Sequence, residues 1–379
     1  MTCRGYLTLD ERFGAAIAAL GAGPVRTRRF LDGFEPSTAW EALADGRHPA
    51  DPDRSYQTKA RPVLVDSVEA ACAATGVTVR ILGRPGYPAS LASDAEAPAV
   101  LFTLGEPSLL DTRPRVAIVG TRSATPYGLG VACELGRGLA DAGVAVVSGL
   151  ARGIDSAAHA GALAAAGGGP PVAVIGTAPD AAVHRADVQL QQGIVEKGAV
   201  LSERAPGSTA APPWCFVVRN RVMAALAHVV VVVECHREGG SMHTVRAASD
   251  RGVAVVAVPG SVRSSASAGC NALLVDGAAP VRDVQDVLSA VELAITGRSG
   301  IVPPRVAQPA STHRTSAVDA PNPVAARTLR ALDHDPASLD TVVRRSGLPL
   351  ADVAEALEQL AAAGLVTGAG GWWSRQNRT

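Results

Sequence analysis

The sequence lacks a net charge and an apolar run long enough to cross a bilayer. Its 379 residues carry 35 basic and 35 acidic side chains, so no overall field attracts the chain to nucleic acid or to an anionic membrane. Affinity for anions must therefore come from local groups of charge. The longest apolar stretch, near residues 224–233, is interrupted by His228 and is too short to span a membrane.

Paired cysteines and targeting signals are also missing. The six cysteines include no Cys-x-x-Cys pair and show no metal-ligand spacing with the eight histidines. The first 14 residues lack the charged and then apolar pattern of a signal peptide. We therefore expect a reduced cytoplasmic protein with no metal ion, no cofactor and no membrane association.

The middle of the chain repeats one sequence pattern, in which apolar runs rich in β-branched residues alternate with Ala-rich segments of helix length. The runs lie near residues 115–119, 144–147, 172–175, 199–201, 229–233 and 253–258. This alternation predicts a doubly wound α/β domain, with a parallel sheet covered on both faces. Two earlier strand-like runs, at 77–82 and 98–102, predict lead-in strands at an edge of that sheet.

Composition divides the chain into four predicted parts. Residues 1–75 read as a small helical domain, 76–297 as the α/β core with its lead-in strands, and 298–322 as a flexible linker rich in Pro, Ser, Ala and Arg. Residues 323–379 contain three helical patches followed by a hairpin-like tail, which describes a winged helix.

The third helix of that last domain, predicted over 350–363, carries Asp352, Glu355 and Glu358 and no Lys or Arg. Such a helix would repel phosphates, so we predict that it does not enter a DNA groove. A protein contact, or regulation of a core dimer, fits it better, while Arg344 and Arg345 leave a weaker DNA role open.

Polar and small residues follow several core strands where those strands end. Gly120, Thr121 and Arg122 follow the first strand, but the Gly-x-Gly-x-x-Gly fingerprint of a dinucleotide-binding site is absent. Ser148, Gly149 and Arg152 follow the second strand, with Asp155 as a candidate N-cap of the next helix. Carboxyl ends of parallel strands meet at one sheet edge, where such folds bind phosphate-bearing ligands.

Three further groups are expected at the same edge. The segment Arg219-Asn220-Arg221 offers two guanidiniums and an amide, which suits a sugar-phosphate backbone with a base contact. Gly240 and Ser241 open another predicted helix. The last strand reaches Val258-Pro259-Gly260-Ser261 and is followed by Gly269-Cys270-Asn271, whose small residues allow close backbone approach.

As a set, in this order and spacing across about 180 residues, these motifs resemble the DNA-processing protein A (DprA, or Smf) family of bacterial natural transformation. The most specific segments are Val119-Gly120-Thr121-Arg122, the run from Ser148 to His159, Arg219-Asn220-Arg221 and Gly240-Ser241 with Thr244. The resemblance implies an extended Rossmann-like core, an N-terminal helical domain of sterile-alpha-motif (SAM) type and a C-terminal winged helix.

The resemblance also implies a function without a catalytic step: binding of single-stranded DNA, homodimerisation through the core and delivery of the strand to the recombinase RecA. Arg122, Arg219 and Arg221 would hold phosphates, and small residues would shape the floor of the site. The candidate DNA-binding residues are Gly120, Thr121, Arg122, Ser148, Gly149, Arg152, Arg219, Asn220, Arg221, Gly240, Ser241 and Asn271.

Two alternatives stay open at this point. Rossmann-like phosphoribohydrolases also carry Gly-rich anion turns at this sheet edge, but the stretch from Glu238 to Val245 lacks the downstream glutamate that their motif places one turn on. A sensor that binds a small nucleotide without turnover is the other alternative.

Overall fold

The computed structural model describes residues 7–181, 185–208, 211–297, 322–332, 337–369 and 372–375. The predicted linker, 298–322, lies outside these residues except for Asn322, which caps the helix that follows. Contacts divide the chain into two compact units, Met1–Ala211 with Arg219–Arg305 and Pro212–Val218 with Val306–Thr379.

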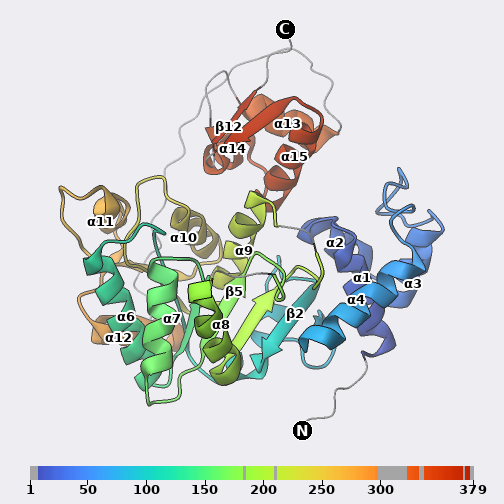
Figure 1. The fold of residues 1–379 in the computed structure, drawn as a ribbon. Coiled ribbons are helices and arrows are strands. Elements are labelled where there is room, and N and C mark those ends of the chain that lie inside the picture. Colours follow the sequence, from blue (N-terminus) through green and yellow to red (C-terminus); the bar gives the residue numbers. More distant parts are fainter. Residues whose placement is uncertain are drawn as a thin grey trace. The chain divides into compact units, whose positions relative to one another are not determined.

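A mostly parallel sheet runs through the first unit. Among the described residues it has nine strands in the order β1-β2-β6-β5-β4-β3-β7-β8-β9. Strand β2 pairs antiparallel with both of its neighbours, β1 and β6, and the other pairs are parallel. Figure 1 labels β2 and β5 of this sheet. The strands are β1 (Thr78–Ile81), β2 (Val100–Gly105), β3 (Arg115–Val119), β4 (Ala145–Ser148), β5 (Pro171–Ile175), β6 (Ala199–Ser202), β7 (Val229–Val232), β8 (Ala254–Ala257) and β9 (Ala279–Pro280). The prediction of a doubly wound α/β core is confirmed.

Helices cover both faces of this sheet, which explains why its central strands are apolar throughout. One face carries α6 (Pro126–Asp141), α7 (Ile154–Ala164), α8 (Arg185–Lys197) and α12 (Val284–Thr296). The other carries the end of α9 (Pro213–Leu226), with α10 (Ser241–Asp250) and α11 (Ala268–Val275). Short turns of helix are α5 (Ala89–Ala92), Pro107–Leu110 and Ser265–Ser267.

Helices α6 and α7 lie side by side with their backbones in contact. A Cβ added at Gly136 of α6 would lie 2.2 Å from the Ala158 carbonyl oxygen, and one at Gly161 of α7 would lie 2.0 Å from that of Cys133. Glycine is therefore required on both helices at their contact. This close packing holds the two helices in register with each other. Both helices therefore begin at the edge of the sheet where β3 and β4 end.

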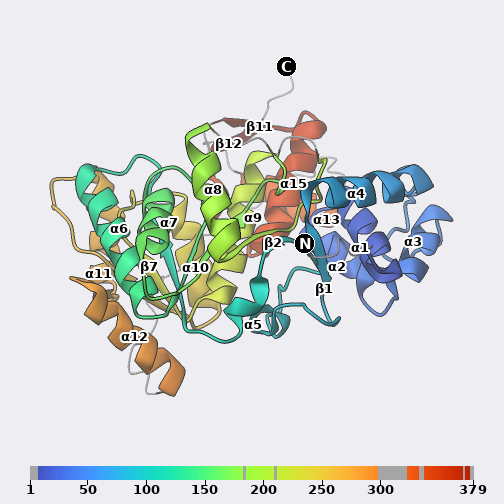
Figure 2. The ribbon, with the colours of Figure 1, turned by 60° about the horizontal axis from the view of Figure 1, so that its bottom comes forward.

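The N-terminal part is helical, as predicted, with α1 (Leu9–Ala19), α2 (Pro24–Leu31), α3 (Pro36–Ala44) and α4 (Pro62–Thr75) beside β1 (Figure 2). Its own core surrounds Phe30, Trp40 and Leu43. A second cluster joins α1 and α4 to β1 and β2, so the helices and the edge strands share apolar contacts. The SAM-type assignment stays a prediction.

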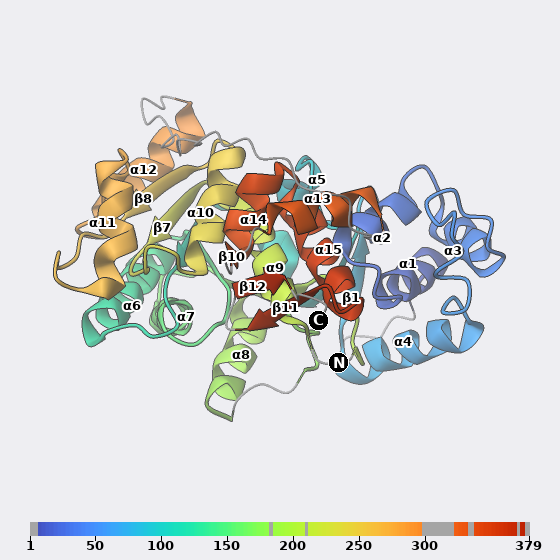
Figure 3. The same cartoon turned by 90° about the horizontal axis from the view of Figure 1, so that it is seen from above.

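The second unit contains the predicted winged helix (Figure 3). Its elements are α13 (Pro323–Ala331), β10 (Ala337–Ser338), α14 (Leu339–Ser346), α15 (Leu350–Ala362), β11 (Val366–Ala369) and β12 (Trp372–Arg375). The strand order β10-β12-β11 completes a three-stranded antiparallel sheet. The acidic helix of the sequence is α15, and the exposed Arg344 and Arg345 lie in the last turn of α14.

Candidate nucleic-acid interface

The predicted residues gather where the parallel strands end, around the point at which the winding of the sheet reverses. The chain moves outward from β3 through β4, β5 and β6 and then returns to place β7 on the other side of β3. In open α/β sheets the ligand site lies at such a reversal. The turns after β3 and β7 are therefore the centre of the candidate interface.

The turn that carries Arg122 is held by close backbone contacts. The Thr121 amide donates to the Glu234 carbonyl at 2.7 Å, and the Thr121 carbonyl accepts from the Ile154 amide at 3.3 Å. Gly153 has a φ of 93°, and a Cβ there would lie 2.4 Å from the Thr121 carbonyl oxygen. Arg122 is exposed at the tip of this fixed turn.

Glu234 occupies the start of α6. Its side chain accepts from the Thr125 amide at 2.9 Å and from the Thr125 hydroxyl at 2.6 Å, and it is only 1% exposed. A Cβ at Gly128 would lie 2.3 Å from one of its carboxylate oxygens. The anion at this helix N-terminus is thus the protein's own carboxylate. This helix N-terminus is therefore already occupied by a side chain of the protein itself.

Ser148 and Gly149 support the site from beneath. The Ser148 hydroxyl is fully buried and donates to the Ile118 carbonyl at 2.6 Å, which ties β4 to β3. A Cβ at Gly149 would lie 2.1 Å from a terminal guanidinium nitrogen of Arg219. Gly149 therefore provides the room in which the Arg219 side chain lies.

Asp155 is not the N-cap that the sequence suggested. Helix α7 begins at Ile154 with Gly153 as its cap, and the Asp155 carboxylate turns back to accept from the Ala151 amide at 3.4 Å. The sequence motif fits an N-cap locally, but the buried Arg219 draws the carboxylate inward. Burial raises the pKa of Asp155, and the charge of Arg219 opposes that rise.

Arg219 is 6% exposed, and its guanidinium donates to the Val174 carbonyl at the end of β5. Burial lowers the pKa of Arg219 to about 10; Asp155 opposes this shift, and the charge of Arg122 adds to it. Arg219 thus stays protonated at neutral pH. Of these two cations, Arg219 is buried and Arg122 is exposed.

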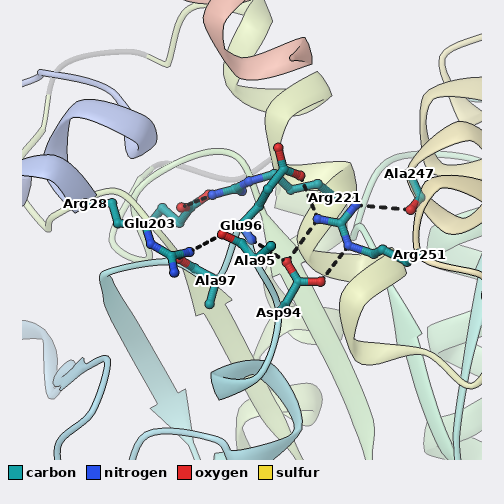
Figure 4. Close-up of polar contacts among 9 residues, drawn as sticks. All are labelled: Arg28, Asp94, Ala95, Glu96, Ala97, Glu203, Arg221, Ala247 and Arg251. Atoms are coloured by element: carbon teal, nitrogen blue, oxygen red, sulfur yellow. Dashed lines mark hydrogen bonds and ion pairs between the residues drawn. The ribbon is translucent and has the colours of Figure 1, made fainter. Parts of the chain in front are cut away.

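Arg221 points to a different partner. Its two terminal nitrogens each donate to a carboxylate oxygen of Glu203 at 2.7 Å, and Arg221 is 5% exposed (Figure 4). Burial lowers the pKa of Arg221, but the attraction and hydrogen bonds of Glu203 outweigh it and raise the pKa overall. The structure therefore separates Arg221 from the pair formed by Arg122 and Arg219.

A second ion-pair group lies beside this one. Arg251 donates to Asp94 and Glu96 at 2.7 Å each, and Arg28 of α2 donates to the carbonyls of Ala95 and Ala97 in the same loop (Figure 4). The loop before β2 is thus held by Arg28 of α2 and by Arg251, the residue that caps the end of α10.

The remaining predicted residues brace loops. The Asn220 amide donates to the Gly240 carbonyl at 3.3 Å, which links α9 to the start of α10. Asn271 bonds Gly260 twice, accepting from its amide at 3.2 Å and donating to its carbonyl at 3.1 Å. Ser241 is buried at the first position of α10.

Exposure thus divides the twelve candidates into three groups. Arg122, Arg152 and Gly240 are exposed, Gly120, Thr121 and Asn271 are half-buried, and the rest are buried.

Sequence reasoning missed Glu203 and Glu234 as partners within the site. A carboxylate directly after a core strand, among several arginines, was the available signal.

Across the described ranges, no group of three or more His, Cys, Asp or Glu side chains is arranged to hold a metal ion. No helix in the same ranges has the length and apolar character needed to cross a membrane.

Sequence comparisons match both units to one family. The profile of DNA recombination-mediator protein A matches residues 78–292, and that of the DprA winged helix domain matches residues 312–371. A Mycobacterium tuberculosis relative named as a DprA DNA processing protein is 43% identical over 196 residues, which are 52% of this chain and 50% of that protein. Protein Smf of Escherichia coli is 30% identical over 77% of this chain and 75% of its own. The chain spans about half the length of the M. tuberculosis relative.

Two solved structures of this family share the fold. DprA from Streptococcus pneumoniae superposes with a TM-score of 0.61 at 30% identity, covering 75% of this chain and 98% of that one. DprA from Helicobacter pylori, described for its single-stranded DNA binding mode, has a TM-score of 0.51 at 27% identity and covers 59% of this chain and 98% of that one.

Proposed function

This chain belongs to the DNA recombination-mediator protein A family, and we propose that it binds single-stranded DNA at the carboxyl edge of its parallel sheet. The observation that carries the proposal is the exposed Arg122, held on a rigid turn between Glu234 and Gly153 with a second cation, Arg219, behind it. Because the backbone of this turn is held in place, only the side chain of Arg122 loses conformational freedom when its guanidinium binds a phosphate.

The proposal gives different roles to the three arginines. Arg122 contacts a phosphate directly, and the exposed Arg152 lies next to Gly153 on the same rim. Arg219 adds charge from beneath and donates to the Val174 carbonyl near the end of β5. Arg221 supports the floor through Glu203 and does not contact DNA.

The proposal extends to the role that family resemblance implies. The bound strand would be protected during DNA processing in transformation or recombination and passed to RecA by a homodimer, without a catalytic step. The nucleotide-sensor alternative is disfavoured by one observation, since Glu234 fills the helix N-terminus where such a ligand would place its phosphate.

The test compares labelled oligothymidine with a matched duplex by fluorescence anisotropy over a salt series. Arg122→Ala should weaken single-strand binding about tenfold, or about 1.4 kcal/mol, and should reduce the log-log salt slope by about 0.7. The matched control is Arg137→Ala, which removes an exposed arginine from α6 well away from its start. Preference for the duplex, or equal losses in the two variants, would contradict the proposal.

A further inference from the structure

A cluster of three sulfur atoms lies directly behind the proposed DNA-binding turn. The Sγ atoms of Cys235 and Cys270 are 3.8 Å apart, and both side chains are 0% exposed. The Sδ of Met242, on α10, lies 3.9 Å from the Cys235 Sγ. Cys235 follows β7, and Cys270 is the third residue of α11, so the pair joins two separate elements.

The backbones of these two elements already touch. The Gly269 amide donates to the Cys235 carbonyl at 2.8 Å, and a Cβ at Gly269 would lie 2.4 Å from the Cys235 Sγ. A disulfide has an S–S length of about 2.05 Å, so the sulfurs need to approach by about 1.8 Å. Side-chain rotation with a small backbone shift supplies a movement of that size.

The surroundings give the two thiols different acidities. The hydrogen bond shared with Cys270 is the main reason that the pKa of Cys235 is lowered, although burial opposes it. The same interaction, together with burial, raises the pKa of Cys270. In such a pair one sulfur is the nucleophile and the other keeps its proton until the second step.

We propose that Cys235 and Cys270 form a reversible disulfide that closes on reaction with a peroxide. The Cys235 thiolate attacks one peroxide oxygen, the O–O bond breaks, and the leaving oxygen takes a proton, which gives a sulfenic acid and water or an alcohol. Cys270 then loses its proton and attacks that sulfur, so the S–S bond forms and the hydroxyl leaves as water. Two electrons from the two thiols reduce one peroxide.

Formation of the disulfide would change the DNA site, a consequence that rests on the proposed function. Glu234, the residue before Cys235, accepts from the Thr121 amide through its carbonyl and holds Thr125 through its carboxylate. Movement of Cys235 toward Cys270 therefore displaces the turn that carries Arg122. The reduced and oxidised forms then differ in affinity for single-stranded DNA.

The first experiment treats the full-length reduced chain with hydrogen peroxide, alkylates the free thiols after unfolding and maps the peptides by mass spectrometry. The expected product is a peptide pair joined through Cys235 and Cys270 that separates with dithiothreitol. Cys133→Ser is the matched control, because it removes a partly exposed thiol and should leave the product unchanged. Alkylation of both Cys235 and Cys270 after peroxide, or joining of either to another cysteine, would overturn the proposal.

A second variant tests the order of events without relying on the disulfide. In Cys270→Ala, Cys235 should be trapped as a sulfenic acid and labelled by dimedone, whereas Cys235→Ala should leave Cys270 unlabelled. The reverse pattern contradicts the assignment of the nucleophile. Circular dichroism shows whether each variant is folded, and the wild-type mapping remains decisive if one is not.

The third measurement compares oligothymidine binding by the reduced and oxidised wild type. The dissociation constant should differ by about fivefold or more, and dithiothreitol should restore the reduced value. Formation of the disulfide with unchanged affinity would refute the coupling to the DNA site. Absence of binding by the reduced protein would instead refute the proposed function and leave the disulfide intact.

Discussion

Replacing Glu203 by alanine leaves the buried guanidinium of Arg221 without its bidentate partner. The side chains of Arg221 and Glu203 are only 6% and 17% exposed, and both N–O distances are 2.7 Å. Loss of one member of a buried pair costs about 3–5 kcal/mol, because the remaining charge stays desolvated. Since Glu203 retains some contact with water, we expect a loss near the lower end, about 3 kcal/mol.

The loss of unfolding free energy is measured by urea unfolding. An unchanged slope of the transition (the m-value) checks that unfolding stays two-state. The Glu203→Leu/Arg221→Leu double variant should recover much of the stability, because apolar side chains remove both desolvation costs. Asp286→Ala, which breaks an exposed pair with Arg282, serves as the control and should change stability far less. A loss below about 1 kcal/mol for Glu203→Ala would refute the reasoning.

The same variant distinguishes two roles for Arg221 in DNA binding. If Arg221 contacts phosphate, Glu203→Ala frees its guanidinium and tightens binding of oligothymidine. If Arg221 supports the floor of the site, affinity stays the same or falls. We expect no tightening, because the Arg221 side chain is enclosed where it meets Glu203.

Two further predictions follow from helix packing and burial. Gly136→Ala should destabilise the protein by about 1–3 kcal/mol in urea, because the new methyl would lie 2.2 Å from the Ala158 carbonyl, whereas Gly130→Ala in the same helix has open space and should not. Burial lowers the pKa of His159 to about 4, so the unfolded chain binds the proton first. Stability should be full above about pH 6.5 and fall by up to about 3 kcal/mol toward pH 4, and His159→Gln should flatten this fall.

Much of the core could be predicted because its local signals agree. The predicted run at 115–119 coincides with β3, and the run at 229–233 contains β7. Short runs of β-branched residues between turn residues favour buried parallel strands, which is why both were predicted. Strand β9 was missed. It has only two residues, Ala279 and Pro280, and no β-branched run marks it.

The strand ends that the sequence indicates are present in the fold, but the side-chain contacts around them could not be read from the sequence. Strand ends place Arg122 at the carboxyl edge of the sheet, which topology alone ensures. Arg219 lies within α9 instead and meets the end of β5 through its side chain, which donates to the Val174 carbonyl. The partners of the charges depend on contacts across the fold, such as Glu203 with Arg221 and Glu234 with Thr125, which are 18 and 109 residues apart. Sequence spacing carries no information about such pairs, so the sequence did not show that Glu234 covers the start of α6.

The apolar cluster that joins the N-terminal helices to the edge strands limits how the protein can be shortened. Ala15, Val68 and Cys72 cover Val79 and Phe102, which are all nearly inaccessible to water. A fragment that starts at residue 76 would present this side of β1 and β2 to solvent at the border of the sheet. Exposed apolar strands at the edge of a sheet pair with strands of other copies of the same chain. Experiments on an isolated core would therefore encounter self-association created by the truncation itself.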